Sequence, residues 1–122
     1  MRRLGLSKQK TAYLRDLASR AHSGEIDFPA LRRMTDAEVI EALTQVKGIG
    51  VWTAQMFLLF ALRRPNVLPS GDLGIRVAVQ RAYSLAEVPK PAEVERIASP
   101  WHPFCSLASW YLWRSLEGRA GL

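Results

Sequence analysis

The chain has 122 residues, a length that suits one domain with a modest hydrophobic core. Hydrophobic residues make up 48% of it and charged residues 23%, a balance that excludes an intrinsically disordered protein. Seventeen Lys and Arg against eleven Asp and Glu give a net charge of +6, which favours a partner such as nucleic acid or an anionic membrane surface but is also common in proteins that bind neither.

The first predicted element is a helix over residues 8–24, where apolar residues recur at helical spacing. Ser7 is placed to cap its N-terminus, and Gly24 is placed to end it. Residues 25–34, which read EIDFPALRRM, are predicted to form a loop with a short helical turn.

The next two predicted helices are joined by a very short connection. The segment TDAE fits a capping box, in which Thr35 caps the helix and Glu38 reaches back to it. This helix is expected to end at residues 47–48. The second helix of the pair is expected over residues 51–62, and it is apolar around most of its surface and therefore central.

The second half of the chain continues the helical pattern. Prolines and polar residues predict a loop over residues 63–71, and Asp72 stands where a helix over residues 73–85 begins. A linker and a short helix follow in residues 88–99, and the last helix is expected within residues 100–118. No strand alternation of useful length appears.

The sequence therefore predicts an all-α fold of five or six helices. Residues 1–122 are expected to form a single compact domain, and residues 35–62 are expected to form a helix-hairpin-helix motif within it. Such short helix pairs occur in many helical domains, so the motif needs further evidence before it indicates a function.

The cysteine content and the apolar runs exclude several classes. Cys105 is the only cysteine, so the chain can build neither an intrachain disulfide, nor a four-cysteine iron–sulfur cluster, nor a cysteine-rich zinc site. His22 and His102 lack a second ligand at metal spacing, so no metal is predicted there. The start of the chain has no signal-peptide core, and the apolar run over residues 56–62 is too short to span a bilayer, so a cytoplasmic protein is expected.

The connection between the paired helices reads KGIG, from Lys47 to Gly50. Its glycines permit backbone angles that side chains forbid, and Ile49 can turn inward to pin the two helices. The amides that follow lie in the first turn of a helix, so they can point at an anion, helped by the helix dipole and by the charge of Lys47. Such a turn grips a phosphate without reading bases. For a G-x-G turn alone, a plain helix connection is the more frequent explanation.

The residues around this turn resemble a known family. Residues 43–83 read LTQVKGIGVWTAQMFLLFALRRPNVLPSGDLGIRVAVQRAY and combine the hairpin, a proline-containing loop and D-L-G-I-R, twenty-two residues beyond Gly50. This pattern resembles the helix-hairpin-helix DNA glycosylases that carry a Gly/Pro-rich loop and an aspartate. It is most similar to the branch that contains DNA-3-methyladenine glycosylase II. The resemblance extends almost from one end of the chain to the other.

Asp72 has two roles that need not exclude each other. Its position at a loop-to-helix junction predicts an N-cap, whereas the resemblance implies that it is the catalytic carboxylate. Breaking an N-glycosidic bond builds positive charge on the sugar, as in glycoside hydrolysis, and a fixed carboxylate stabilises that charge. The same group can orient or deprotonate the attacking water.

The resemblance also implies the type of reaction and the pocket for the damaged base. Trp52 stands where bifunctional relatives carry a lysine that attacks the sugar, and Lys47 does not match that position, so an enzyme without lyase activity is expected. Trp52, Met56 and Trp113 are assigned to the base pocket. Methylation at N3 or N7 makes a purine cationic, and an aromatic face attracts such a cation by about 0.5–2 kcal/mol.

Other aromatic residues are expected to lie in the core, because aromatics at helical spacing usually pack. These residues are Phe57, Trp101, Trp110 and Tyr111.

By the same resemblance, the hairpin and its neighbour contact the DNA backbone, through Lys47, Gly48, Ile49, Gly50 and Thr53. A sodium or potassium ion held by the backbone carbonyls of Val46 and Gly48 is a further implication. No other cofactor is expected, and the single cysteine argues against the iron–sulfur cluster that some relatives carry.

The chain departs from the family in two places. Relatives carry further helices before the segment LGLS, residues 4–7, and the chain is expected to lack them, which would expose apolar surface and open one wall of the site. Cys105 stands where many relatives have arginine, so a positive charge is missing there. No base lies near Cys105 in the sequence, so a nucleophilic role is not expected.

One function and two alternatives follow. The predicted function is base excision repair: hydrolysis of the N-glycosidic bond of alkylated purines such as 3-methyladenine, after the base has been flipped out of the duplex. The partner is then double-stranded DNA with alkylated bases, and a monomer associated with the nucleoid is expected. The first alternative is a non-catalytic helix-hairpin-helix DNA-binding module. The second is a helical protein-interaction bundle, which absent or salt-insensitive DNA binding would favour.

Overall fold

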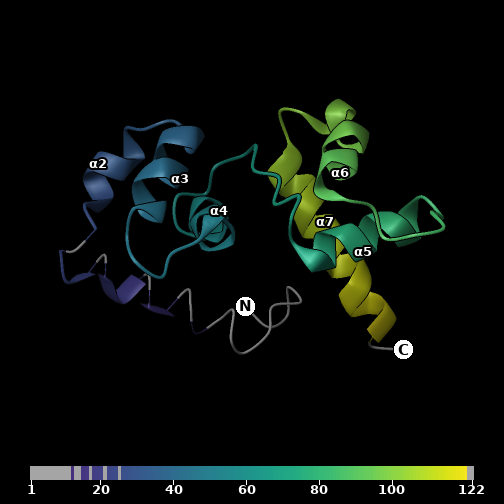
Figure 1. The fold of residues 1–122 in the computed structure, drawn as a ribbon, viewed down its shortest axis with the longest axis horizontal. Coiled ribbons are helices and arrows are strands. Elements are labelled where there is room, and N and C mark those ends of the chain that lie inside the picture. The colour runs from purple at the N-terminus through teal and green to yellow at the C-terminus, as the bar shows by residue number, and fades with distance from the viewer. Residues whose placement is uncertain (1–11, 13–14, 17, 21, 25, 121–122) are drawn as a thin grey trace. The chain divides into compact units, whose positions relative to one another are not determined.

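The computed structural model describes residues 12, 15–16, 18–20, 22–24 and 26–120, and every regular element named in that part of the chain is helical (Figure 1). The elements, in chain order, are α2 (Phe28–Arg32), α3 (Asp36–Thr44), α4 (Val51–Phe60), α5 (Leu73–Ala82), α6 (Pro91–Ile97), the 3₁₀ helix η2 (Ser99–Trp101) and α7 (Cys105–Ala120). The predicted all-α fold is confirmed. Ser7, the predicted cap of the first helix, lies outside the described residues.

The described part of the chain divides into two compact units, one that ends at Arg64 and one that begins at Pro65. The first unit contains α2, α3 and α4, and the second contains α5, α6, η2 and α7. The single domain expected over residues 1–122 stays a prediction. No helix among the described residues is long and apolar enough to cross a membrane.

In the first unit, α3 packs against α4 and forms the predicted hairpin. The capping box at the start of α3 is confirmed: the Thr35 hydroxyl accepts from the Glu38 amide at 3.2 Å, and the Glu38 carboxylate accepts from the Thr35 amide at 2.8 Å. The core of this unit consists of aliphatic and aromatic side chains from all three helices and their loops, with Phe28 and Phe57 in edge-to-face contact at 5.4 Å. The hairpin therefore rests on a packed hydrophobic core.

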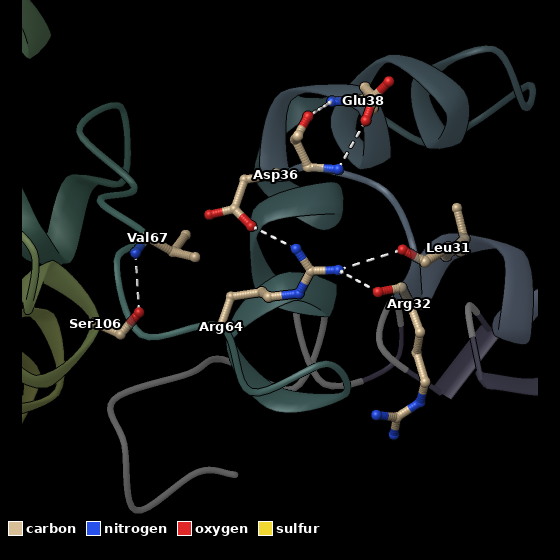
Figure 2. A network of polar contacts seen from close by, with 8 residues as sticks. Leu31, Arg32, Asp36, Glu38, Arg64, Val67 and Ser106 are labelled. Carbon is tan, nitrogen blue, oxygen red and sulfur yellow. Dashed lines mark hydrogen bonds and ion pairs between the residues drawn. The ribbon is translucent and has the colours of Figure 1, made fainter.

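Arg64 ties the end of the hairpin to the elements before it (Figure 2). Its guanidinium pairs with the Asp36 carboxylate at 3.0 Å and donates to the carbonyls of Leu31 and Arg32 at 3.3 and 3.2 Å. Those carbonyls belong to the last turn of α2, where the Leu31 carbonyl also accepts from the Met34 amide at 3.0 Å. One side chain thus fixes the C-terminus of α2 and the N-terminus of α3.

In the second unit, α5 packs against α7 and, more narrowly, against α6. The inward side chains of α5 are Ile75, Ala78 and Val79, which follow helical spacing. The Arg76 guanidinium donates to the carbonyl of Pro89 at 2.8 Å and links α5 to the segment that precedes α6.

Several helix ends differ from the sequence-based predictions. The second hairpin helix ends at Phe60 and not at residue 62, because the chain turns through Arg63, which has a positive φ of 53°. The helix after Asp72 ends at Ala82 and not at residue 85, where Ser84 makes a similar turn with φ of 53°. The last helix begins at Cys105, because η2 and a proline without an amide hydrogen precede it.

The aromatic residues predicted to lie in the core differ in how far they are buried. Phe57 is buried, and Trp101 and Trp110 are half-buried. The prediction for Tyr111 is wrong, since 60% of this residue is exposed. Tyr111 lies two residues before the buried Trp113 on α7, and positions two apart on a helix point in different directions.

Candidate functional site

The hairpin turn has the geometry that its two glycines predict. Gly48 has φ of +90°, a left-handed conformation that residues with side chains rarely adopt. This turn directs Ile49 inward, where only 7% of the residue is exposed, and the Ile49 amide donates to the Val46 carbonyl at 3.1 Å. Lys47 is exposed. The turn thus combines a buried anchor with a positive charge at the surface.

The start of α4 has no side-chain cap. Gly50 occupies the N-cap position with an extended backbone, and its carbonyl accepts the first helical hydrogen bond, from Ala54 at 3.1 Å. In contrast, side chains cap α2, α3 and α5. A helix N-terminus that carries no capping side chain, next to a lysine, can receive an anion such as a phosphate.

Arg20 is a contact of the hairpin that the sequence did not reveal. Its guanidinium donates to the Lys47 carbonyl at 3.3 Å and pairs with the Asp16 carboxylate at 3.1 Å. Arg20 and Lys47 are 27 positions apart, so no local pattern connects them. A second positive side chain therefore lies at the turn.

The carbonyls assigned to a monovalent cation lie in this turn. The Val46 carbonyl accepts the Ile49 amide, and the Lys47 carbonyl, between Val46 and Gly48, accepts the Arg20 guanidinium. A positive side chain thus already contacts the turn between the two predicted ligands. The sodium or potassium ion stays a prediction.

The remaining residues predicted on α4 differ in their accessibility. Trp52 is half-buried. Met56 is fully buried, and Thr53 is 9% exposed. Thr53 is the third residue of α4, so its backbone amide belongs to the first turn, even though its side chain packs inward. Trp52 is the least buried of these three residues.

Asp72 and Trp113 are brought together in the second unit. Asp72 is the N-cap of α5 and only 3% of it is exposed. Its Oδ2 accepts two hydrogen bonds of 3.0 Å each, from the Ile75 amide and from Nε1 of Trp113. The predicted N-cap is therefore confirmed, and the second donor comes from 41 positions away.

Gly74 is part of this site and was not predicted to be. A Cβ at this position would lie 3.0 Å from Asp72 Oδ2 and 3.3 Å from both Cδ1 and Nε1 of Trp113. The absence of a side chain at Gly74 leaves room for the indole to reach the carboxylate. A glycine in the first turn of a helix, where it has a cost in helix propensity, was the available signal.

The loop that leads to Asp72 is bound to the start of α7. The Asn66 carboxamide accepts from the Cys105 amide at 3.2 Å and contacts Nδ1 of His102 at 3.0 Å. The Val67 amide donates to the Ser106 hydroxyl at 2.9 Å, a contact drawn in Figure 2. Because α7 also carries Trp113, these bonds hold the loop and the indole on the same helix.

Cys105 and the histidines do not form a reactive or metal-binding cluster among the described residues, where no group of three or more His, Cys, Asp or Glu residues is close enough to hold a metal ion. Cys105 is fully buried, and this desolvation raises the pKa of its thiol. A buried thiol with a raised pKa is a poor nucleophile.

Comparisons with known proteins agree with these features. The family described as HhH-GPD superfamily base excision DNA repair protein matches residues 1–103. DNA-3-methyladenine glycosylase 1 of Schizosaccharomyces pombe is 38% identical over 116 residues, which cover 94% of this chain and 51% of the relative.

Two solved structures are similar as well. The 3-methyladenine DNA glycosylase Mag1 of fission yeast, in complex with abasic DNA, has a TM-score of 0.73 and 38% identity over 90% of this chain and 54% of its own. A DNA-3-methyladenine glycosidase from Bacillus halodurans has a TM-score of 0.67 and 37% identity over 91% and 51%. The chain spans about half the length of these three relatives.

Proposed function

The chain belongs to the HhH-GPD superfamily of base excision DNA repair proteins, and from this premise we propose that it is a monofunctional DNA glycosylase for alkylated purines such as 3-methyladenine. The names of its relatives support this substrate class. The single observation that carries the proposal is the carboxylate of Asp72, which is almost fully buried and held by two N–H donors.

The environment of Asp72 suits an ionised carboxylate. One donor is a backbone amide at the N-terminus of α5, where the helix dipole favours a negative charge. The other is an indole N–H, which also stabilises the charged form. A carboxylate fixed in this way does not have to reorient when positive charge develops nearby, so it stabilises that charge without a reorganisation cost.

The reaction breaks the bond between C1′ of the deoxyribose and the purine nitrogen. The bonding electron pair leaves with the base, and a base that carries a positive charge through methylation becomes neutral. Asp72 stabilises the positive charge that develops on the sugar. Water then bonds to C1′ and gives up one proton, and we assign to Asp72 the role of orienting this water or accepting its proton.

Trp52 supports hydrolysis without lyase activity. In the family pattern, the position of Trp52 belongs to the lysine of bifunctional enzymes, and an indole cannot form the Schiff base that cleavage of the DNA strand requires. An aromatic ring at a half-buried position suits contact with a cationic purine. Trp52 is therefore assigned to base recognition, and Met56, four residues further along α4, is buried in the core of its unit.

Binding to the DNA backbone is assigned to the hairpin. The uncapped start of α4, Lys47 and the turn from Gly48 to Gly50 form a phosphate-binding arrangement. The abasic DNA bound to fission-yeast Mag1 supports DNA as the partner. The base must leave the stack before the carboxylate reaches its sugar.

The test is release of 3-methyladenine from methylated duplex DNA by this chain, with Asp72→Asn as the matched variant. Asparagine caps a helix as well as aspartate and has nearly the same shape, so the variant removes the charge and keeps the fold. We expect base release to fall by roughly 100-fold or more, as when other preorganised charge-stabilising groups are removed. Binding to abasic duplex DNA should persist.

The same assay separates the alternatives. DNA binding without base release by the parent chain would support a non-catalytic DNA-binding module. Absence of salt-sensitive DNA binding would support a protein-interaction bundle. Cleavage of the DNA strand after base release would contradict the assignment of Trp52. Duplexes with 7-methylguanine, ethenoadenine and hypoxanthine define the range of damaged bases.

A further inference from the structure

Trp113 was expected to line the base pocket, and the structure gives its indole a different contact. Only 2% of Trp113 is exposed, and its Nε1 donates to Asp72 Oδ2 at 3.0 Å. The bond lies in a buried environment, where it is stronger than at the surface. The ring therefore acts on the carboxylate through its N–H.

The glycine next to this bond leaves room for it. Gly74 leaves the space in which the pyrrole edge of Trp113 approaches Asp72, and a Cβ there would be 3.0 Å from Oδ2. Gly74 has no positive φ that would demand glycine, so the backbone accepts alanine and only the space restricts it.

One face of α7 contacts both ends of the loop that leads to Asp72. Cys105, Ser109 and Trp113 follow one another at intervals of four residues, and all three are buried. The Cys105 amide donates to Asn66 at 3.2 Å, and the Trp113 indole reaches Asp72 at the far end. Between them, the Ser109 hydroxyl lies 3.4 Å from the Val67 carbonyl, although its shorter contact, at 2.8 Å, is with the Cys105 carbonyl of its own helix. The same helix therefore holds the loop and orients the carboxylate at its end.

We propose that Trp113 is a positioning residue for Asp72: its indole N–H, together with the Ile75 amide, fixes the rotation of the carboxylate toward the sugar. This inference rests on the proposed glycosylase function. It assigns to Trp113 an effect on the rate of base release and not on the binding of the base or of DNA. Gly74 permits the contact.

The test compares Trp113→Phe with Trp110→Phe. Phenylalanine keeps an apolar ring at position 113 and removes the N–H donor. Trp110 lies one turn earlier on α7, is half-buried, and its ring contacts Tyr111 and Arg114 and not Asp72, so it is the matched control. We expect the single-turnover release of 3-methyladenine to fall about 10- to 100-fold in Trp113→Phe. The Kd for abasic duplex DNA should stay unchanged, and Trp110→Phe should match the parent in both.

Gly74→Ala tests the same contact from the other side and decides the result if Trp113→Phe fails to fold. Alanine is the better helix former, so a loss of activity without loss of helix content points to disturbance of the contact between the indole and the carboxylate, both of which the new Cβ would meet. Because both changes break one contact, the double variant should be no slower than the slower single variant. Fully additive losses would overturn the proposal.

The outcomes also separate this inference from the proposed function. If the parent releases the base and Trp113→Phe releases it at the same rate, the positioning role of Trp113 is overturned and the proposed glycosylase function stands. A loss of DNA affinity equal to the loss of rate would make Trp113 a binding residue and overturn the positioning role. If the parent releases no base, the proposed function fails and this inference fails with it.

Discussion

The hairpin and the Asp72 site differ in how the start of a helix is finished. The hairpin presents backbone and an exposed lysine, and Gly50 leaves the start of α4 without a side-chain cap. The start of α5 is capped by Asp72, which is buried and accepts hydrogen bonds from two N–H donors. A phosphate needs an accessible helix end, whereas a catalytic carboxylate needs a fixed and largely dry one.

The two sites also differ in the range of sequence that builds them. The turn is closed within four residues, by the Ile49 amide and the Val46 carbonyl. The carboxylate depends on Trp113, 41 positions away, and on the space at Gly74. Substitutions in the hairpin should therefore disturb the structure only near the turn. Substitutions at Asp72 should also disturb the contact with Trp113 on α7.

The largest effect on stability is expected for Asp72→Ala. Alanine removes the acceptor of two buried donors, each of which costs about 1–3 kcal/mol when left unpaired. We expect the free energy of unfolding to fall by about 2–5 kcal/mol, measured by urea denaturation. Asp72→Asn keeps an acceptor and should lose less than about 1 kcal/mol. Equal losses in the two variants would show that the carboxylate is not the acceptor that these donors require.

A smaller effect is expected for Gly48→Ala in the hairpin. At φ of +90° an alanine is strained, so the free energy of unfolding should fall by about 1–2 kcal/mol. Gly50→Ala is the matched control, since Gly50 has φ of −97° and open space around its Cβ position, and it should lose less than about 1 kcal/mol. A larger loss in Gly50→Ala would contradict the assignment of strain to Gly48.

Lys47→Gln should change DNA binding and leave stability unaltered, because Lys47 is exposed. Removal of one phosphate contact lowers the slope of log K against log salt concentration by about 0.9. Arg96→Gln removes the same charge from an exposed position in the last turn of α6, outside the proposed interface, and serves as control. Fluorescence anisotropy with a duplex oligonucleotide at several salt concentrations measures both slopes. If the slope for Lys47→Gln equals the slope for the control variant, Lys47 does not contact a phosphate.

The smallest effect concerns the capping box of the hairpin. The hydrogen bonds from the Thr35 backbone and side chain hold the pKa of the Glu38 carboxyl below its usual value. A lowered folded-state pKa means that the contribution is present above the unfolded-state pKa and is lost as pH falls through the folded-state pKa. Glu38→Gln should therefore make the urea midpoint less dependent on pH in the acid range. An unchanged dependence would exclude Glu38 as its source.

The sequence by itself determined the helical fold, the capping boxes and caps at Thr35 and Asp72, the inward turn of Ile49 and the family. These features depend on residues within about one helical turn of one another, where spacing and backbone preference leave few alternatives. The family followed from a run of motifs that lie close together in the chain.

Only the tertiary structure decided the contact between Trp113 and Asp72, the need for glycine at position 74 and the approach of Arg20 to the hairpin. It also showed that Tyr111 points outward and that Trp113 is closed off from solvent. The physical reason is that helical spacing tells which residues share a face, while the partner of that face depends on packing between helices that are far apart in sequence.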